Sequence, residues 1–139
     1  MRIRQYAYFG LWSRLTPASE MTARLGLEPD EVSVRAARSA APPLPVSHAW
    51  KVVCRDRGLT VDEQTARIVV RLGPFAATIG ALGTALQQAE GEVSGARLQI
   101  VRYFDDKNGE PELLGWHLDR DLLEFLRVTG ADIDVDEYG

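Results

Sequence analysis

The sequence predicts an α+β protein built on a single mixed β-sheet of about six strands, with helices packed mainly on one face in a ferredoxin-like or related two-layer sandwich. Two observations carry this prediction. A strand, a short helix closed by glycine and a second strand follow one another over residues 6–34, and the same order returns over residues 114–135. Between them lie a long helical stretch and a hairpin signal rather than a long βαβ series, which favours a mixed sheet.

The size of the chain supports one domain over residues 1–139. With 139 residues, 45% of them hydrophobic, the chain can bury a continuous core without further staples. The lone cysteine, Cys54, excludes an internal disulfide and favours a reducing compartment. The first residues lack the apolar core of a signal peptide, and we expect no apolar run to approach the roughly 18 residues that a membrane helix needs. We therefore expect a cytoplasmic protein with no membrane partner.

The N-terminal strand alternates with a period of two. One face would carry Ile3, Ala7, Phe9 and Leu11, and the other would carry Arg2, Arg4, Tyr6, Tyr8 and Trp12. Thr16 and Pro17 predict the start of a helix that Gly26 ends, with Thr16 as the capping residue. A strand near residues 32–34 follows.

The middle of the chain predicts a loop, a strand and two helical stretches. Residues 37–47 hold three prolines, which exclude a helix and predict an exposed loop within the domain. A strand over 49–54 follows it. Thr60 can cap a helix over 61–72, and Gly73-Pro74 breaks or kinks it before a second helical stretch that runs to about residue 88.

The last third predicts a hairpin, a helix and a final strand. Residues 97–104 and 113–118 would be antiparallel strands joined by the turn cluster at 105–109. Asp119 would cap a helix that ends at Gly130, and a strand around Ile133 and Val135 closes the chain.

Several of these segments together resemble a bacterial family known only as domain of unknown function 4279. The resemblance is carried by residues 8–11 with the helix up to Gly26, by residues 48–50, by residues 61–64, and by residues 115–118 with the acidic C-terminal strand. It covers nearly the whole chain. These motifs are structural, so the resemblance implies a fold and carries over no catalytic residue. Small bacterial families of this size include immunity proteins against secreted toxins, an analogy of class alone.

Charge is distributed unevenly along the chain. Residues 1–104 carry 13 basic and 9 acidic side chains, whereas residues 105–139 carry 3 basic and 11 acidic ones. An acidic surface that steers a cationic partner is one interpretation. The other is that the acidic strand lies beside a basic element of the same sheet.

Aromatic side chains make the face of the sheet opposite the helices the candidate binding site. Tyr6, Tyr8 and Trp12 would point away from the helices, and Trp50 or Trp116 could join them from other strands. Large aromatic surfaces are typical of binding sites. A second layer, the proline loop or a second copy of the chain could equally bury them. The leading hypothesis is a noncatalytic protein-interaction module, with a protein partner or self-association through this face and the acidic last strand.

A catalytic alternative rests on the segment from residue 116 to residue 121. His117 with Asp119 or Asp121 could form an acid/base pair at the start of a helix. Against this, Asp119 already serves as the helix cap, and Asp121 suits the positive end of the helix dipole. A small enzyme therefore stays the alternative to the interaction module.

No cofactor or metal site is predicted. Asp132, Asp134 and Asp136 share one face of the last strand, but Glu137 stands where a calcium loop needs glycine, so charges that protect a sheet edge explain them better. His48 and His117 lack a second ligand at zinc spacing. The sequence pI near 5.2 argues against binding of nucleic acid.

Overall fold

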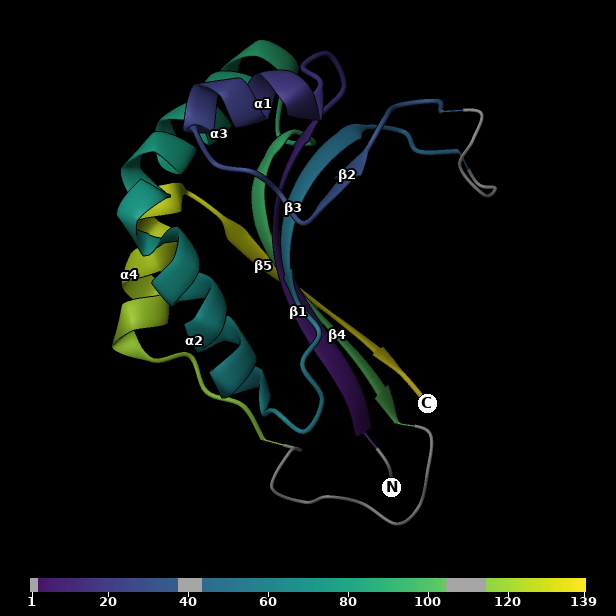
Figure 1. Ribbon diagram of the computed structural model, residues 1–139, viewed down its shortest axis with the longest axis vertical. Helices are drawn as coiled ribbons and strands as arrows, with labels where there is room; N and C mark the ends of the chain where they lie inside the picture. The colour runs from purple at the N-terminus through teal and green to yellow at the C-terminus, as the bar shows by residue number, and fades with distance from the viewer. Residues whose placement is uncertain (1–2, 38–43, 105–114) are drawn as a thin grey trace.

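The computed structural model describes residues 3–37, 44–104 and 115–139 (Figure 1). In chain order the elements are β1 (Ile3–Ser13), α1 (Ala18–Leu25), β2 (Glu31–Ser33), β3 (His48–Cys54), α2 (Val61–Leu72), the 3₁₀ turn η1 (Gly73–Phe75), α3 (Ala76–Glu90), β4 (Gly95–Phe104), α4 (Arg120–Thr129) and β5 (Asp132–Tyr138).

The strands form one five-stranded mixed sheet in the order β2-β3-β1-β4-β5. All neighbouring strands are antiparallel except β4 and β5, which are parallel. Strands β1 to β4 and their helices follow the ferredoxin-like pattern, in which β3 lies between β1 and β2. The predicted fold class is confirmed, with β5 added as an extra edge strand beside β4.

The helices pack together on one side of this sheet (Figure 1). Phe9 and Leu11 of β1 and Trp50 of β3 are fully buried beneath them, and Leu98 and Ile100 of β4 continue the same core. Phe9 meets Phe125 of α4 edge to face, with ring centroids 5.2 Å apart. The alternation predicted for β1 is confirmed for the described residues, because Ala7, Phe9 and Leu11 are all inaccessible to solvent.

Two of the three predicted helix caps are confirmed. Thr60 and Glu63 form a reciprocal capping box at the start of α2, and the Asp119 carboxylate accepts from Leu122 N at 2.8 Å. The prediction for Thr16 is wrong: Pro17 occupies the capping position of α1, with no side-chain cap. Thr16 N instead donates to Ser13 Oγ at 2.8 Å, which holds it in the preceding turn.

The predicted hairpin partner over residues 113–118 is wrong where it can be compared. Residues 113 and 114 and the turn at 105–109 lie outside the described residues, and residues 115–119 form an irregular segment that leads into α4. Trp116 and Leu118 are partly buried and pack against the core, and neither belongs to a strand. His117 N donates to Asp62 Oδ1 at 2.7 Å, which ties the segment to the start of α2.

The interruption predicted at Gly73-Pro74 is confirmed, because the 3₁₀ turn η1 separates α2 from α3, and α3 ends at Glu90, close to the predicted residue 88. Counted with that turn, Val61–Glu90 is one helical run of 30 residues. By length and composition this run could cross a membrane, which corrects the expectation that no apolar stretch is long enough. Core helices of soluble proteins pass the same test, and here Ile68, Leu72 and Ile79 are buried in the core that the helices share with the sheet.

The proline-rich loop predicted over 37–47 is described only at residue 37 and at residues 44–47. In that part Leu44 and Val46 are exposed, and Ala36 N donates to Pro45 O at 2.9 Å across the base of the loop.

Candidate functional site

The sheet face opposite the helices, called the open face below, has no helix over it in the part of the chain that the structure describes (Figure 1). The strands bend so that this face lies on the inside of the curve. Register and alternation place its side chains in rows that cross all or most of the sheet. The open face consists of Glu31, Lys51, Val53, Arg55, Arg4, Tyr6, Tyr8, Gly10, Trp12, Arg97, Gln99, Val101, Tyr103, Asp132, Asp134, Asp136 and Tyr138.

A column of aromatic rings runs along β1 at the centre of the open face. The ring centroids of Tyr6 and Tyr8 lie 6.2 Å apart, and those of Tyr8 and Trp12 also lie 6.2 Å apart. All three side chains are half-buried. Burial, together with the negative charge of Asp136, raises the pKa of the Tyr8 hydroxyl, so it stays neutral well above physiological pH.

Gly10 provides the floor on which the Trp12 indole lies. A β-carbon placed on Gly10 would come within 2.5 Å of Cη2 of Trp12. The absent side chain therefore lets the ring lie flat over the sheet backbone. This contact holds Trp12 close to the sheet, although no helix or strand of the described residues lies over it.

Cations from β3 and from the residue that follows it lie over the rings on one flank of the column. Arg55 Cζ lies 4.5 Å from the Tyr6 centroid, and Lys51 Nζ lies 4.8 Å from that of Tyr8 and 5.9 Å from that of Trp12. Arg55 also pairs with Glu31 at 2.8 Å. Burial lowers the pKa of Lys51, and the described part of the chain contains no carboxylate in ion-pair contact with it.

Carboxylates from β5 lie on the opposite flank. Asp132 forms two hydrogen bonds with Arg97, at 2.8 and 3.1 Å, and Asp136 accepts from Gln99 Nε2 at 3.2 Å. Asp134 lies between them and forms no ion pair with another described side chain. The three aspartates share one face as predicted, but the described residues contain no group of acids, histidines or cysteine that could hold a metal ion.

Two tryptophans expected at the open face lie elsewhere. Trp50 is fully buried in the core because it stands opposite Leu11, which points toward the helices. Trp116 precedes α4 and packs partly buried against the core. Both placements correct the sequence analysis.

The sequence analysis did not place Lys51 on the open face, because neighbouring residues of a strand point to opposite faces and Trp50 was assigned to that face. The alternation along β3 could have corrected this. Trp50, Val52 and Cys54 share one face of β3, and these three side chains are more apolar than the set that contains Lys51. Tyr103 and Tyr138, whose rings stack with centroids 5.0 Å apart at the far end of the open face, were also missed.

The residues of the catalytic alternative do not form a shared site. His117 is exposed, the Asp119 carboxylate is occupied as the cap of α4, and Asp121 is exposed in the first turn. Asp121 lines a shallow hollow of about 430 Å³ with Glu124, Phe125 and Val128 of α4 and residues of α2, η1 and α3, and no histidine is among them. The described geometry therefore offers no support for acid/base chemistry here.

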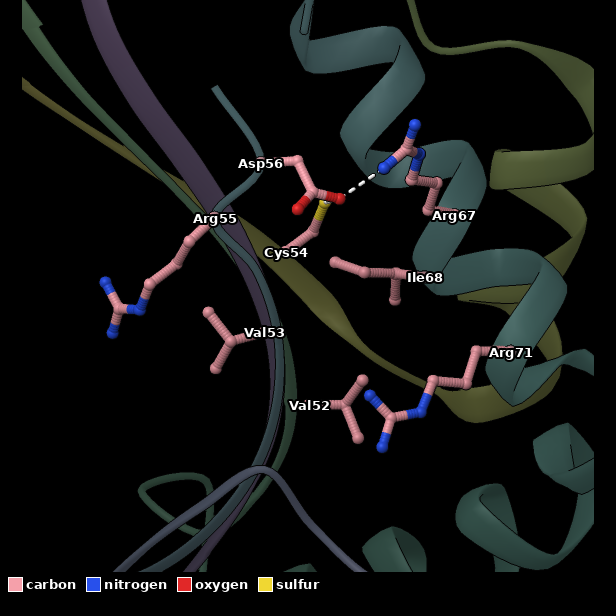
Figure 2. Close-up of a pocket in the computed structure, with 8 residues that line it drawn as sticks. All are labelled: Val52, Val53, Cys54, Arg55, Asp56, Arg67, Ile68 and Arg71. Atoms are coloured by element: carbon pink, nitrogen blue, oxygen red, sulfur yellow. Dashed lines mark hydrogen bonds and ion pairs between the residues drawn. The ribbon is translucent and has the colours of Figure 1, made fainter. Parts of the chain in front are cut away.

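Cys54 lines a small cavity of about 160 Å³ between β3 and α2 (Figure 2). Arg67 and Arg71 reach into it from α2, but each already has an acidic partner, Asp56 and Asp30 respectively. The Cys54 sulfur lies 3.8 Å from Asp56 Oδ2. Because both arginines are paired within the chain, the cavity is explained as a structural ion-pair cluster rather than an anion site.

Asp30 explains how the exposed edge of β3 is protected. It accepts from Val53 N at 2.8 Å and from Arg71 Nη1 at 2.7 Å. Strand β2 covers β3 only from Ala49 to Lys51, so the Asp30 carboxylate takes the place of the next ladder partner.

A second cavity adjoins the open face beside Trp12. It measures about 260 Å³, and its wall includes the exposed Val46 and Val93 as well as the ion pair between Arg97 and Asp132. The open face therefore ends in a partly apolar hollow next to its largest aromatic ring.

The fold and this face define a class: a ferredoxin-like α+β sandwich in which the described elements cover one sheet face and the other is lined with aromatic rings and charged side chains. The chain matches, over residues 3–139, the model of the family described as "Domain of unknown function (DUF4279)", and it belongs to that family. No curated protein and no solved structure matches it.

Proposed function

We propose that this protein is a noncatalytic protein-interaction module that binds its partner through the open face, including the acidic strand β5. One observation carries the proposal: a sheet face without a covering layer holds an ordered column of half-buried rings, with cations on one flank and carboxylates on the other. Ordinary exposed sheet faces are polar rather than lined with tyrosine and tryptophan.

The rings of the open face are held in place before any partner binds. Trp12 lies against the backbone at Gly10, and the cations of Lys51 and Arg55 stand over Tyr8 and Tyr6. Tyrosine and tryptophan provide a large contact area and retain a polar tip. Because their positions are already fixed, little side-chain entropy is lost on association.

The charge on β5 gives this surface a preference among partners. Asp132, Asp134, Asp136 and Glu137 follow one another along an edge of the sheet. They favour approach of a cationic surface and oppose that of a phosphate backbone. An immunity-like role against a basic toxin would fit this charge, although its support is an analogy with other small families.

The test compares two double variants of a tagged protein in extracts of its own cell. Tyr8→Ala with Trp12→Ala removes the centre of the ring column, and we expect proteins retained by the wild type to be lost. Val70→Ala with Leu123→Ala is the matched control, because both side chains are exposed on the helical layer.

Circular dichroism and thermal unfolding establish that each variant is folded. Retention of the same proteins by the Tyr8/Trp12 variant and by wild type would contradict the proposal. Equal loss in both variants would also contradict it, because the helical layer would then matter as much as the open face.

A further inference from the structure

We infer that the occupant of the open face is a second copy of this chain, docked face to face about a twofold axis parallel to β1. The inference rests on the proposed function, because it names the partner of the same surface. It is argued from the distribution of charge across the face, from the charges left without a partner, and from the size and curvature of the sheet.

Charge changes sign from one side of the aromatic column to the other. On one side of the column lie Lys51 of β3 and Arg55, which directly follows β3. On the other side, two strands from β1, β5 presents Asp134 and Asp136. A twofold axis parallel to the strands exchanges these flanks, so the basic flank of one copy lies over the acidic flank of the other. An axis perpendicular to the strands would instead place the basic flank of one copy over the basic flank of the other, and the acidic over the acidic. Repulsion between like charges disfavours that arrangement.

The rows of the sheet bring these groups to matching heights. Lys51 is in register with Gly10, Gly10 with Arg97 and Arg97 with Asp132. In the next row but one, Tyr6, Val101 and Asp136 are in register, and Arg55 stands over Tyr6. A rotation about an axis parallel to the strands preserves height. With that axis between β1 and β4, β3 of one copy lies over β5 of the other, so Lys51 faces Asp132 and Arg55 faces Asp136.

On the open face, the amine of Lys51 and the carboxylates of Asp134 and Asp136 form no ion pair with another described side chain. The amine and the two carboxylates carry opposite charges and lie on opposite flanks. In a twofold dimer the basic flank of each copy lies over the acidic flank of the other, so both contacts bring opposite charges together.

The size of the face is adequate for a stable dimer. The strands have 3 to 11 residues and lie about 4.8 Å apart, so at about 3.3 Å per residue the sheet covers roughly 600 Å², the lower end of the surface that each partner buries in a standard interface. The open face also lies on the inside of the curve of the sheet (Figure 1). Two such faces can close around a shared interior, which the tyrosine and tryptophan rings would fill.

Edge-to-edge pairing is the competing way for two copies to associate. Antiparallel pairing of two β5 strands would set Asp132, Asp134, Asp136 and Glu137 against the same residues of the other copy. Like charges opposite one another destabilise such a pair. The same acids that disfavour an edge dimer favour the face-to-face arrangement.

The experiment uses two charge-reversed variants of the full chain. The basic-flank variant carries Lys51→Glu and Arg55→Glu, and the acidic-flank variant carries Asp134→Lys and Asp136→Lys. Sedimentation is measured over about 1–500 μM. We expect the wild type to be a dimer, and each variant alone to dissociate at least about 100-fold more readily, because each places like charges together in both contacts.

The decisive sample is an equal mixture of the two variants. In a mixed dimer, the substituted basic flank of one chain faces the substituted acidic flank of the other, so opposite charges meet. In the second contact, the native Lys51 and Arg55 face native aspartates. Dimers should therefore return in the mixture although neither variant forms them alone. A mixture that stays monomeric, or variants that dimerise alone as well as wild type, would overturn the inference.

The wild type provides a test that does not depend on the folding of any variant. Dilution should expose Trp12 to water and shift its fluorescence to longer wavelength, and Trp12→Phe should remove that shift while Trp50 and Trp116 remain. A wild type that is monomeric over the whole range would overturn the inference. The proposed function would survive that result if the Tyr8/Trp12 variant still lost its retained proteins.

Discussion

The covered face and the open face are built from the same five strands, but they hold their side chains in different ways. On the covered face, Phe9, Leu11 and Trp50 are fixed by close packing under the helices. On the open face, Tyr8 and Trp12 are fixed by cations, by the bare backbone of Gly10 and by each other. Close packing on the covered face stabilises the fold, whereas the open face leaves the surface of its rings available for contact with another molecule.

A matched pair of tryptophan variants should show the largest difference between the faces. Trp50→Ala empties a fully buried site, and we expect it to lower the free energy of unfolding by about 3–5 kcal/mol. Trp12→Ala removes a half-buried ring from the open face and should cost about 1 kcal/mol. Urea denaturation measures both, and equal losses would show that Trp12 belongs to the folding core.

Two glycine variants sharpen the comparison at the level of single contacts. A β-carbon on Gly80 of α3 would lie 2.2 Å from the carbonyl oxygen of Val128, a backbone atom of α4 that cannot move aside. We expect Gly80→Ala to destabilise the protein by about 1–3 kcal/mol. At Gly10 the obstructing atom is the end of the Trp12 side chain, so Gly10→Ala should displace the ring and cost less than 1 kcal/mol by comparison.

Thermal unfolding with tryptophan fluorescence distinguishes these outcomes. Gly10→Ala should change the emission of the folded protein, because Trp12 loses its position. Gly80→Ala should leave that emission unchanged while it lowers the melting temperature. A reversed order of the two stability losses would contradict the assignment of rigid and adaptable contacts to the two faces.

The local pattern predicted much of this architecture from sequence. The alternation of β1 and the capping groups Thr60 and Asp119 are decided by near neighbours, so they could be identified without tertiary information. The placement of Trp50 could not. Strand β3 carries apolar residues on both faces, including Ala49 and Val53, and only pairing with Leu11 decides which face is covered.

The segment before α4 is a second place where the sequence alone could not predict the structure. Trp116 and Leu118 alternate with other residues as the inward side chains of a strand do, yet they pack against the core from an irregular segment. Nothing within the segment indicates that Asp62 of a distant helix accepts the backbone hydrogen bond of His117. The candidate face was predicted through Tyr6, Tyr8 and Trp12, but its basic flank was not.

The smallest predicted effect concerns Glu90, which joins the end of the helical layer to the end of β1. Its carboxylate accepts from Ser13 Oγ at 2.5 Å, from Arg14 N at 2.6 Å and from Ser94 Oγ at 3.1 Å. Burial alone would raise the pKa of Glu90, but these hydrogen bonds outweigh it and hold that pKa below its ordinary 4.5.

The sign of the pH dependence follows from that lowered pKa. The ionised carboxylate stabilises the fold above pH 4.5, and this contribution is lost as the pH falls through the lower pKa of the folded state. Glu90→Gln should therefore reduce stability at neutral pH and flatten its decline below pH 4.5. Denaturation of both proteins between neutral and acidic pH measures this, and parallel curves would contradict it.

The position of β1 has a consequence for how the chain reaches its native state. This strand precedes the other four in the chain, yet one of its two neighbours is β4, and the contact of Gln5 with Arg102 spans 97 positions. Its ladder on that side cannot form until β4 has been synthesised. Closing so long a loop slows folding, and meanwhile the tyrosines of an unpaired first strand remain available to chaperones and to neighbouring nascent chains.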